Sequence, residues 1–316
     1  MSQLHRHALP GDTPPRHPAP GHPAPGYRHL SLTGIDPSGF SADDLKALAS
    51  KTLERKIHGL SFSPYQDGQG PGTQIGETQI RQRLDVIKSH SNWIRTFSCT
   101  DGNELIPQIA KECGLKTVVG IWLDNDHEKN EKEFQNALKV AQAGHVDILA
   151  VGNEVLLRND LTEDQIIAYL ERAKKAEPDL EVAYVDAYFK FVDHPRVTAA
   201  CDVIMANCYP FWEGCPAEYA LPYMKDMYHR ATEAAGGKRV IISETGWPDQ
   251  GSAEGGAVPS TENALKYFID TYAWAEEAGI EVFYFSSFDE AWKVGAEGDV
   301  GAFWGLWDKD GNFKYV

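Results

Sequence analysis

From Lys56 onward, short runs rich in β-branched and aromatic residues alternate regularly with longer stretches that have helical spacing. Eight such runs predict strands, at 57–63, 93–98, 117–123, 147–155, 181–187, 203–210, 239–245 and 281–288. The intervening stretches predict helices at 77–89, 103–113, 130–143, 162–176, 196–200, 217–235 and 261–278. Because the strands are apolar nearly throughout, we expect a parallel sheet with both faces covered.

Eight β/α units in roughly 260 residues predict the α/β class and a single (β/α)₈ TIM barrel, assigned to residues 30–316. A doubly wound sheet is the alternative, but no G-x-G-x-x-G or P-loop follows any strand. Residues 1–29 repeat the pentapeptide His-Pro-Ala-Pro-Gly, which favours extended polyproline geometry and predicts a Pro/His-rich tail or linker. A short helix is predicted over 41–54, with Ser41 as its N-cap.

The chain carries 46 acidic and 30 basic residues, for a formal charge of −16. Such a surface repels phosphate backbones, so no nucleic-acid partner is expected. No apolar run approaches the length of about 18 residues that predicts a membrane span, and the N-terminus shows no secretory signal. The five cysteines have no C-x-x-C spacing, which predicts buried free thiols and no metal site. A Cys208–Cys215 disulfide is the alternative.

Active residues of such barrels lie at the carboxyl ends of the strands. Glu154 directly follows the apolar run ILAVGN, and Glu244 directly follows RVIIS. A charged group there is costly unless it has a partner or a task. Each glutamate could simply pair with a barrel-mouth Arg or Lys, but two of them favour a task. Strands four and seven lie three places apart, so the carboxylates can face each other across the mouth, as in retaining glycoside hydrolysis.

Aromatic residues also gather at these strand ends, and their flat faces suit the apolar faces of pyranose rings. The alternative is that about half of them belong to the core. The candidates for a sugar platform are Tyr65, Trp122, Phe211, Trp212, Trp247 and Trp292.

Four segments carry a family resemblance: Val151-Gly-Asn-Glu-Val155, Asn207-Cys-Tyr-Pro210, Ile242-Ser-Glu-Thr-Gly-Trp-Pro248 and the closing stretch at 305–315. Together they resemble glycoside hydrolase family 17, the β-1,3-glucanases and related glucanosyltransferases of the clan-A (β/α)₈ group. The likeness covers residues 57–316.

The resemblance implies that Glu154 is the acid/base and Glu244 the nucleophile of a double displacement. It further implies that Asn153 holds the sugar 2-hydroxyl, with a cap for the following turn as the alternative. Tyr209 resembles the tyrosine whose hydroxyl steadies the nucleophile. Acid protonation and carboxylate attack suffice for this chemistry, so we expect no metal or organic cofactor.

Other positions match the family pattern less specifically. Glu290 and Lys293 fall where the family has a Glu and a Lys at the last strand, and they either contact sugar hydroxyls or form a plain salt bridge. Arg95 is expected beneath Glu244 in the same network. The second strand and the short, Gly-rich interval at 285–304 depart from many plant members and place the chain nearer the bacterial and fungal branches.

The expected protein is therefore a monomeric retaining glycoside hydrolase whose partner is a β-1,3-glucan oligo- or polysaccharide. A β-1,3-glucanosyltransferase is the alternative of the same class, and a non-catalytic carbohydrate-binding barrel is the alternative of another class. The family resemblance implies a secreted, periplasmic or cell-wall location, provided that an upstream signal was removed.

Overall fold

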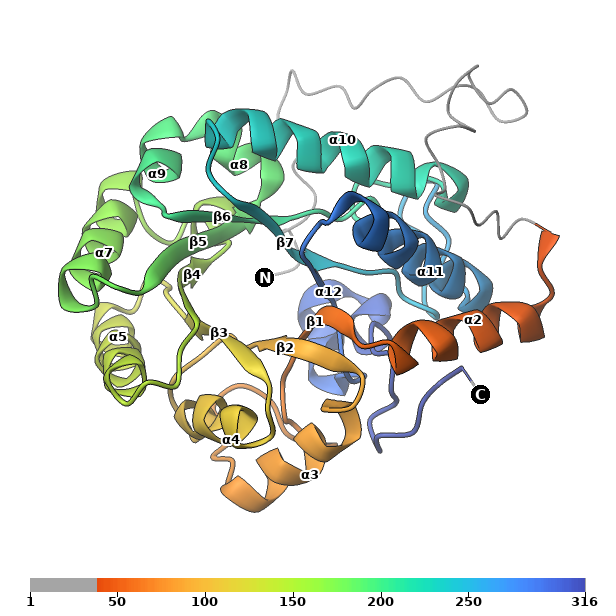
Figure 1. Ribbon diagram of the computed structural model, residues 1–316, viewed down its shortest axis with the longest axis horizontal. Coiled ribbons are helices and arrows are strands. Elements are labelled where there is room, and N and C mark those ends of the chain that lie inside the picture. Colours follow the sequence, from red (N-terminus) through yellow and green to blue (C-terminus); the bar gives the residue numbers. More distant parts are fainter. Residues whose placement is uncertain (1–38, 316) are drawn as a thin grey trace.

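The computed structural model describes residues 39–315, and its eight parallel strands form a closed barrel in chain order (Figure 1). The strands are β1 Ile57–Ser61, β2 Ser91–Arg95, β3 Lys116–Ile121, β4 Ile148–Asn153, β5 Glu181–Ala187, β6 Val203–Asn207, β7 Val240–Thr245 and β8 Val282–Tyr284. Pairing of Gly59 with Phe283 and of Leu60 with Tyr284 closes β8 onto β1. The predicted (β/α)₈ barrel is confirmed, and the predicted tail at 1–29 lies outside the described residues.

Seven longer helices surround the barrel, and in Figure 1 the N-terminal α2 lies alongside α11. They are α2 Ala42–Glu54, α3 Glu77–Ile87, α4 Ile106–Glu112, α5 His127–Gln142, α7 Glu163–Ala176, α10 Ala217–Ala235 and α11 Thr261–Ala278. Shorter helices follow strand ends or lie between longer ones: α6 Val155–Arg158, α8 Tyr188–Asp193, α9 Pro195–Ala200 and α12 Val294–Glu297. Three 3₁₀ turns complete this part of the chain: η2 Asn103–Leu105, η3 Ala291–Lys293 and η4 Asp299–Ala302.

Apolar side chains form two layers, as the nearly continuous apolar strands predict. One cluster includes Val118, Val185, Met205 and Phe283, which alternate along their strands with side chains of a second, much larger cluster. The Phe283 ring needs Gly59, where an added Cβ would lie 2.4 Å from the ring. Burial of this surface is the main term that stabilises the barrel.

The predicted strands extend beyond the observed ones, most clearly at the last strand. The run at 281–288 forms a strand only over Val282–Tyr284, although Phe288 is 2% exposed. Apolar residues beyond a strand are still buried beneath the loops at the barrel mouth, so hydrophobicity alone overestimates strand length. Helix α8 was not predicted, because Tyr188–Asp193 follows β5 without a turn signal. The Ser41 N-cap is confirmed, with its side chain accepting from the Asp44 N–H.

The described residues also answer three expectations about sites. All five cysteines are free thiols, so the alternative Cys208–Cys215 disulfide is not formed, and Cys113 is only partly buried. Within residues 39–315, no three His, Cys, Asp or Glu side chains cluster in a way that could hold a metal ion. In the same range, no helix combines the length and apolar character that crossing a membrane requires.

Candidate active site

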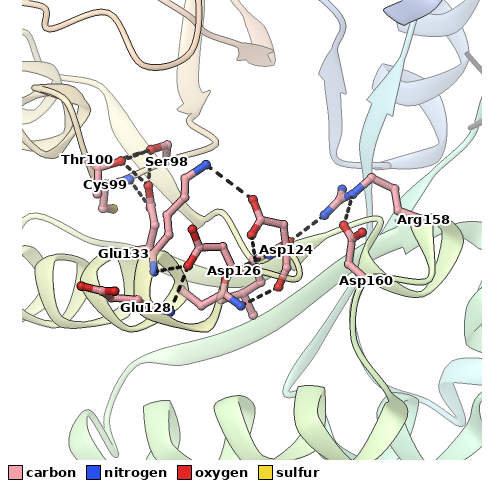
Figure 2. Close-up of polar contacts among 12 residues, drawn as sticks. Ser98, Cys99, Thr100, Asp124, Asp126, Glu128, Glu133, Arg158 and Asp160 are labelled. Carbon is pink, nitrogen blue, oxygen red and sulfur yellow. Dashed lines mark hydrogen bonds and ion pairs between the residues drawn. The ribbon is translucent and has the colours of Figure 1, made fainter. Parts of the chain in front are cut away.

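The loops at the carboxyl ends of β2 and β3 are tied down by a buried carboxylate on α5, Glu133 (Figure 2). The Ser98 and Thr100 hydroxyls each donate to Glu133 at 2.5 Å, and the Cys99 N–H donates at 2.6 Å. Burial raises the pKa of Glu133, while these hydrogen bonds act in the opposite direction. The segment that follows Arg95 is therefore fixed to the outer helical layer.

Interactions of Arg158 connect the loops that follow β3 and β4. Arg158 forms an ion pair with Asp160 at 2.6 Å, visible in Figure 2, and donates to the Leu123 carbonyl at 2.6 Å. Its guanidinium also lies 4.5 Å above the centre of the Trp122 ring. Trp122 is thereby engaged by the protein on one face.

Glu244 is the penultimate residue of β7 and has a donor on each carboxylate oxygen. Arg95 Nη1 donates to Oε1 at 2.5 Å, and the Tyr209 hydroxyl donates to Oε2 at 2.8 Å. Arg95 is 1% exposed and Glu244 6%. Burial raises the pKa of Tyr209 well above its usual range, so the phenol remains a neutral donor. The two contacts expected for Arg95 and Tyr209 are present, and they hold the Glu244 carboxylate in one orientation.

Glu154 follows β4 and has different surroundings. Its Oε1 accepts a hydrogen bond from Asn207 Nδ2 at 2.9 Å, and the Asn207 Oδ1 accepts from the Ser243 hydroxyl at 2.7 Å. Within residues 39–315, no Lys, Arg or His forms an ion pair with Glu154. The two glutamates thus differ chemically, because one contacts a guanidinium and a phenol and the other a neutral amide.

Asn153 and Asn207 connect the two glutamates. Arg95 Nη2 donates to Asn153 Oδ1 at 2.6 Å, so a single guanidinium holds both Asn153 and Glu244. Asn207 lies opposite Glu244 in the pairing of β6 with β7, while its amide reaches Glu154. The alternative role of Asn153, a cap for the following turn, is not seen, since its side chain accepts from Arg95. Asn207 was missed as a site residue, although the Asn-Cys-Tyr-Pro motif contains it.

The segment that follows β8 carries a buried ion pair between Lys293 Nζ and Glu290 Oε2, which are 2.6 Å apart. Burial by itself would lower the pKa of Lys293, but Glu290 and Glu297 raise it above its usual value. Trp292 Nε1 also donates to Glu290 at 3.1 Å. The salt-bridge alternative is therefore observed, and it leaves the sugar-contact interpretation of Glu290 and Lys293 as a prediction.

Glu297 on α12 is a further carboxylate of this region. Burial raises its pKa to about 7; Lys293 acts against the rise, while the carboxylates of Glu290, Glu244 and Glu154 add to it. The sequence offered no signal for this residue, because it lies in the Gly-rich interval between two recognisable motifs. Glu297 therefore lies close enough to both candidate catalytic glutamates to interact with their charges.

The structure shows that the sugar-platform prediction is wrong for two aromatic residues, Trp247 and Phe211. Trp247 is 1% exposed, and its Nε1 donates to the Val258 carbonyl at 3.0 Å. Phe211 is fully buried and makes edge-on contacts with Trp212, Trp247 and Trp304. Neither ring has a free face for a sugar, because both pack in the aromatic layer behind the strand ends.

The other aromatic candidates range from the buried Tyr65 to the exposed Trp292. Trp292 is 39% exposed and meets the edge of Tyr65, which is 8% exposed. Trp212 and Trp122 are partly exposed. These rings remain candidates for sugar contact, and Trp292 has the largest accessible fraction of those named here.

Comparison with known proteins identifies a family and several relatives of the chain. Residues 59–305 match the family model described as the BtgE/BtgC glycoside hydrolase domain. A glucan 1,3-β-glucosidase of Candida albicans is 32% identical over 258 residues, covering 73% of this chain and 83% of that protein. A glucan 1,3-β-glucosidase of Arthroderma benhamiae is 29% identical over 260 residues, covering 76% of this chain and 84% of the relative.

A solved structure agrees with this placement. The glycoside hydrolase family 17 β-1,3-glucanosyltransferase of Rhizomucor miehei superposes with a TM-score of 0.74 at 29% identity, over 83% of this chain and 96% of that one. An endo-laminarinase from Formosa, 18% identical with a TM-score of 0.68, shares the fold. With its barrel and its match over residues 59–305, the chain belongs to the BtgE/BtgC glycoside hydrolases, the family 17 type that includes glucan 1,3-β-glucosidases and β-1,3-glucanosyltransferases.

Proposed function

We propose that this protein hydrolyses β-1,3-linked glucan with retention of configuration, with Glu154 as acid/base and Glu244 as nucleophile. The observation that carries the proposal is the unequal environment of the two glutamates. Arg95 and Tyr209 hold both oxygens of Glu244, whereas Glu154 accepts from the neutral amide of Asn207. Two carboxyl groups in unlike surroundings are what an acid and a nucleophile require.

The substrate class is inferred from relatives. The Candida and Arthroderma proteins are glucan 1,3-β-glucosidases, and an active-site mutant of the Rhizomucor transferase was solved with laminaritriose. The exposed Trp292 and the partly exposed Trp212 offer ring faces for contact with glucose units. Asn153, oriented by Arg95, is placed by this proposal at the sugar 2-hydroxyl, where a hydrogen bond strengthens in the transition state.

The chemistry proceeds in two displacements. In the first, Glu154 gives its proton to the glycosidic oxygen as that oxygen leaves the anomeric carbon, and Glu244 forms an ester to the same carbon. In the second, Glu154 takes a proton from water, and the water oxygen displaces Glu244. The charge that builds on the sugar ring is met by the Glu244 carboxylate, while Arg95 and Tyr209 keep that group aligned.

Retention gives the first expected result. If Glu244 forms a covalent glycosyl ester, the new reducing end that water creates on hydrolysing this ester is initially the β-anomer. Proton NMR during the first minutes, before mutarotation equilibrates the anomers, measures this directly. Initial release of the α-anomer would mean a single displacement by water and would contradict the role of Glu244.

Transfer to a second sugar is the other candidate outcome, favoured by the similarity to the Rhizomucor glucanosyltransferase. Both reactions share the first displacement and differ in whether water or a sugar hydroxyl attacks the ester. A positioned acceptor has a large effective concentration, so contacts with Trp212 and Trp292 could let a millimolar sugar compete with water.

We favour hydrolysis and expect products shorter than the starting sugar. A single laminari-oligosaccharide is incubated at rising concentrations, and product lengths are followed by chromatography with mass spectrometry. Longer products that dominate from the earliest times at low millimolar substrate would make glucan remodelling the function. Absence of any cleavage by the wild-type protein would reject the proposed activity itself.

A further inference from the structure

Glu154 occupies an unusual backbone position for a residue with such a large side chain. Its φ of 51° and ψ of 31° are left-handed, and it is the N-cap of the four-residue helix α6. An N-cap side chain, typically that of Ser, Thr, Asp or Asn, accepts a hydrogen bond from the backbone N–H two or three positions later. The Glu154 side chain makes no such bond and contacts Asn207 instead.

The first turn of α6 is capped by strand β5. The Leu156 N–H donates to the Tyr184 hydroxyl at 2.9 Å and to Asp186 Oδ2 at 3.2 Å. The Tyr184 hydroxyl donates in turn to Asp186, whose second oxygen accepts from the Ala187 N–H at 2.8 Å. Tyr184 and Asp186 are both fully buried. Two side chains remote in sequence therefore do what the N-cap side chain usually does.

The backbone before Glu154 is shaped to receive this pair. Gly152 has a φ of +86°, and a Cβ there would lie 3.2 Å from the Tyr184 ring and 2.9 Å from Val155. A larger residue would need to push the ring away or adopt an unfavourable backbone conformation. The glycine lets β4 pass close to Tyr184, which brings the phenol within reach of the Leu156 N–H.

We propose that Asp186, acting with Tyr184, is a positioning residue for Glu154, because it caps the turn that Glu154 begins and so fixes the backbone from which that carboxyl group reaches Asn207. This inference rests on the function proposed above. Asp186 touches no substrate in this scheme. It acts through the Leu156 N–H on the turn that sets the direction of Glu154.

The electrostatic surroundings of Asp186 also connect it with Glu154. Burial, together with the charge of Glu154, raises the pKa of Asp186 to about 7, while Lys190 on α8 acts in the opposite direction. Tyr184 on β5 donates to it, and Arg158 on α6 faces that phenol. Asp186 therefore lies close enough to Glu154 for the two carboxyl groups to interact, which agrees with its contact with the turn that Glu154 begins.

The test compares two substrates that depend differently on the acid. A laminari-oligosaccharide has a poor leaving group and needs proton donation, whereas a dinitrophenyl glycoside of the same sugar does not. Asp186→Ala and Tyr184→Phe are expected to lower kcat/KM on the oligosaccharide, on the order of 10²-fold for Asp186→Ala, since a small misplacement of a catalytic group has effects of that size. First-step activity on the aryl glycoside should fall by less than about tenfold. Asp186→Asn, which keeps an acceptor for the Leu156 N–H, should lose less activity on the oligosaccharide than Asp186→Ala.

Thr198→Ala serves as the matched control. Thr198 is buried, donates to the Phe191 carbonyl at 2.8 Å, and lies at the amino end of the barrel, where its carbonyl accepts from Lys238. Its loss costs stability without touching α6, so both substrates should be affected equally. If Asp186→Ala fails to fold, Tyr184→Phe and Asp186→Asn carry the same comparison.

Equal losses on both substrates in Tyr184→Phe and Asp186→Asn would overturn the inference and leave Asp186 as a structural residue. A failure of the proposed function looks different. In that case the wild-type protein does not cleave the oligosaccharide, or Glu154→Ala shows no dependence on the leaving group. Thus the same set of measurements distinguishes the two failures.

Discussion

Replacing Glu244 by alanine or glutamine is expected to lower kcat/KM on the order of 10⁴-fold or more, on laminari-oligosaccharides and aryl glycosides alike. The nucleophile is needed whatever the leaving group, because the covalent ester forms with every substrate. Initial rates on both substrates, measured at equal concentrations of folded protein, check this.

The two Glu244 variants separate chemistry from stability. Glu244→Ala leaves the buried Arg95 guanidinium without its carboxylate, which costs about 3–5 kcal/mol when a buried ion pair is broken. Glu244→Gln keeps an oxygen that can accept from Arg95 and should fold more stably. Both should be equally inactive. A glutamine variant with substantial activity would contradict the nucleophile assignment.

Glu281→Gln is the matched control for these variants. Glu281 is also held by an arginine, since Arg239 Nε and Nη2 donate to its two oxygens at 2.6 Å each. It precedes β8 and therefore lies at the amino end of the barrel, away from the candidate site. Its substitution should reduce thermal stability while leaving kcat/KM near the wild-type value.

Replacing Glu154 by alanine is expected to give a different pattern. Activity on laminari-oligosaccharides should fall by about 10²- to 10⁴-fold, the usual contribution of general acid–base catalysis. A dinitrophenyl glycoside should still form the Glu244 ester, because its leaving group needs no proton. The ester should then accumulate and give a burst of released phenol, measured by stopped-flow absorbance.

Azide tests the vacant position left by the Glu154 side chain. As an anion it needs no general base, so it should attack the accumulated ester and raise the turnover of the aryl glycoside. Retention at the anomeric carbon predicts a β-glycosyl azide, identified by NMR. If Glu154→Ala and Glu244→Ala lose the aryl substrate equally and azide restores neither, the division of roles between the two glutamates is wrong.

Much of the candidate site was predictable because it depends on local order along the chain. Glu154 and Glu244 each follow an apolar run, and the carboxyl ends of parallel strands meet at one end of a barrel. Their placement therefore needs only the strand count and the strand order, both of which the periodicity indicates. Strand lengths were less predictable, since residues such as Phe288 remain buried after the strand has ended.

Burial of individual rings required the folded molecule. Trp247 follows Glu244 by three residues and reads like a platform for sugar, yet it is enclosed beside Phe211 and Tyr267. Trp292 stands in a similar motif and is 39% exposed. Nothing in the residue types separates the two, because exposure depends on which loops from other strands cover each ring.

Residue periodicity and motif spacing were thus sufficient for the barrel, its strand order and the strand ends that carry Glu154 and Glu244, since each of these follows from interactions close in the chain. Barrel closure decided the contacts that give each carboxylate its character. Arg95 meets Glu244 across 149 residues of sequence, and Asn207 meets Glu154 across 53. Asp186 caps the turn after Glu154 from a neighbouring strand, by accepting a hydrogen bond from the Leu156 N–H, 30 residues away in the sequence. Such pairings depend on strand register and side-chain direction in three dimensions, and a one-dimensional pattern does not contain either.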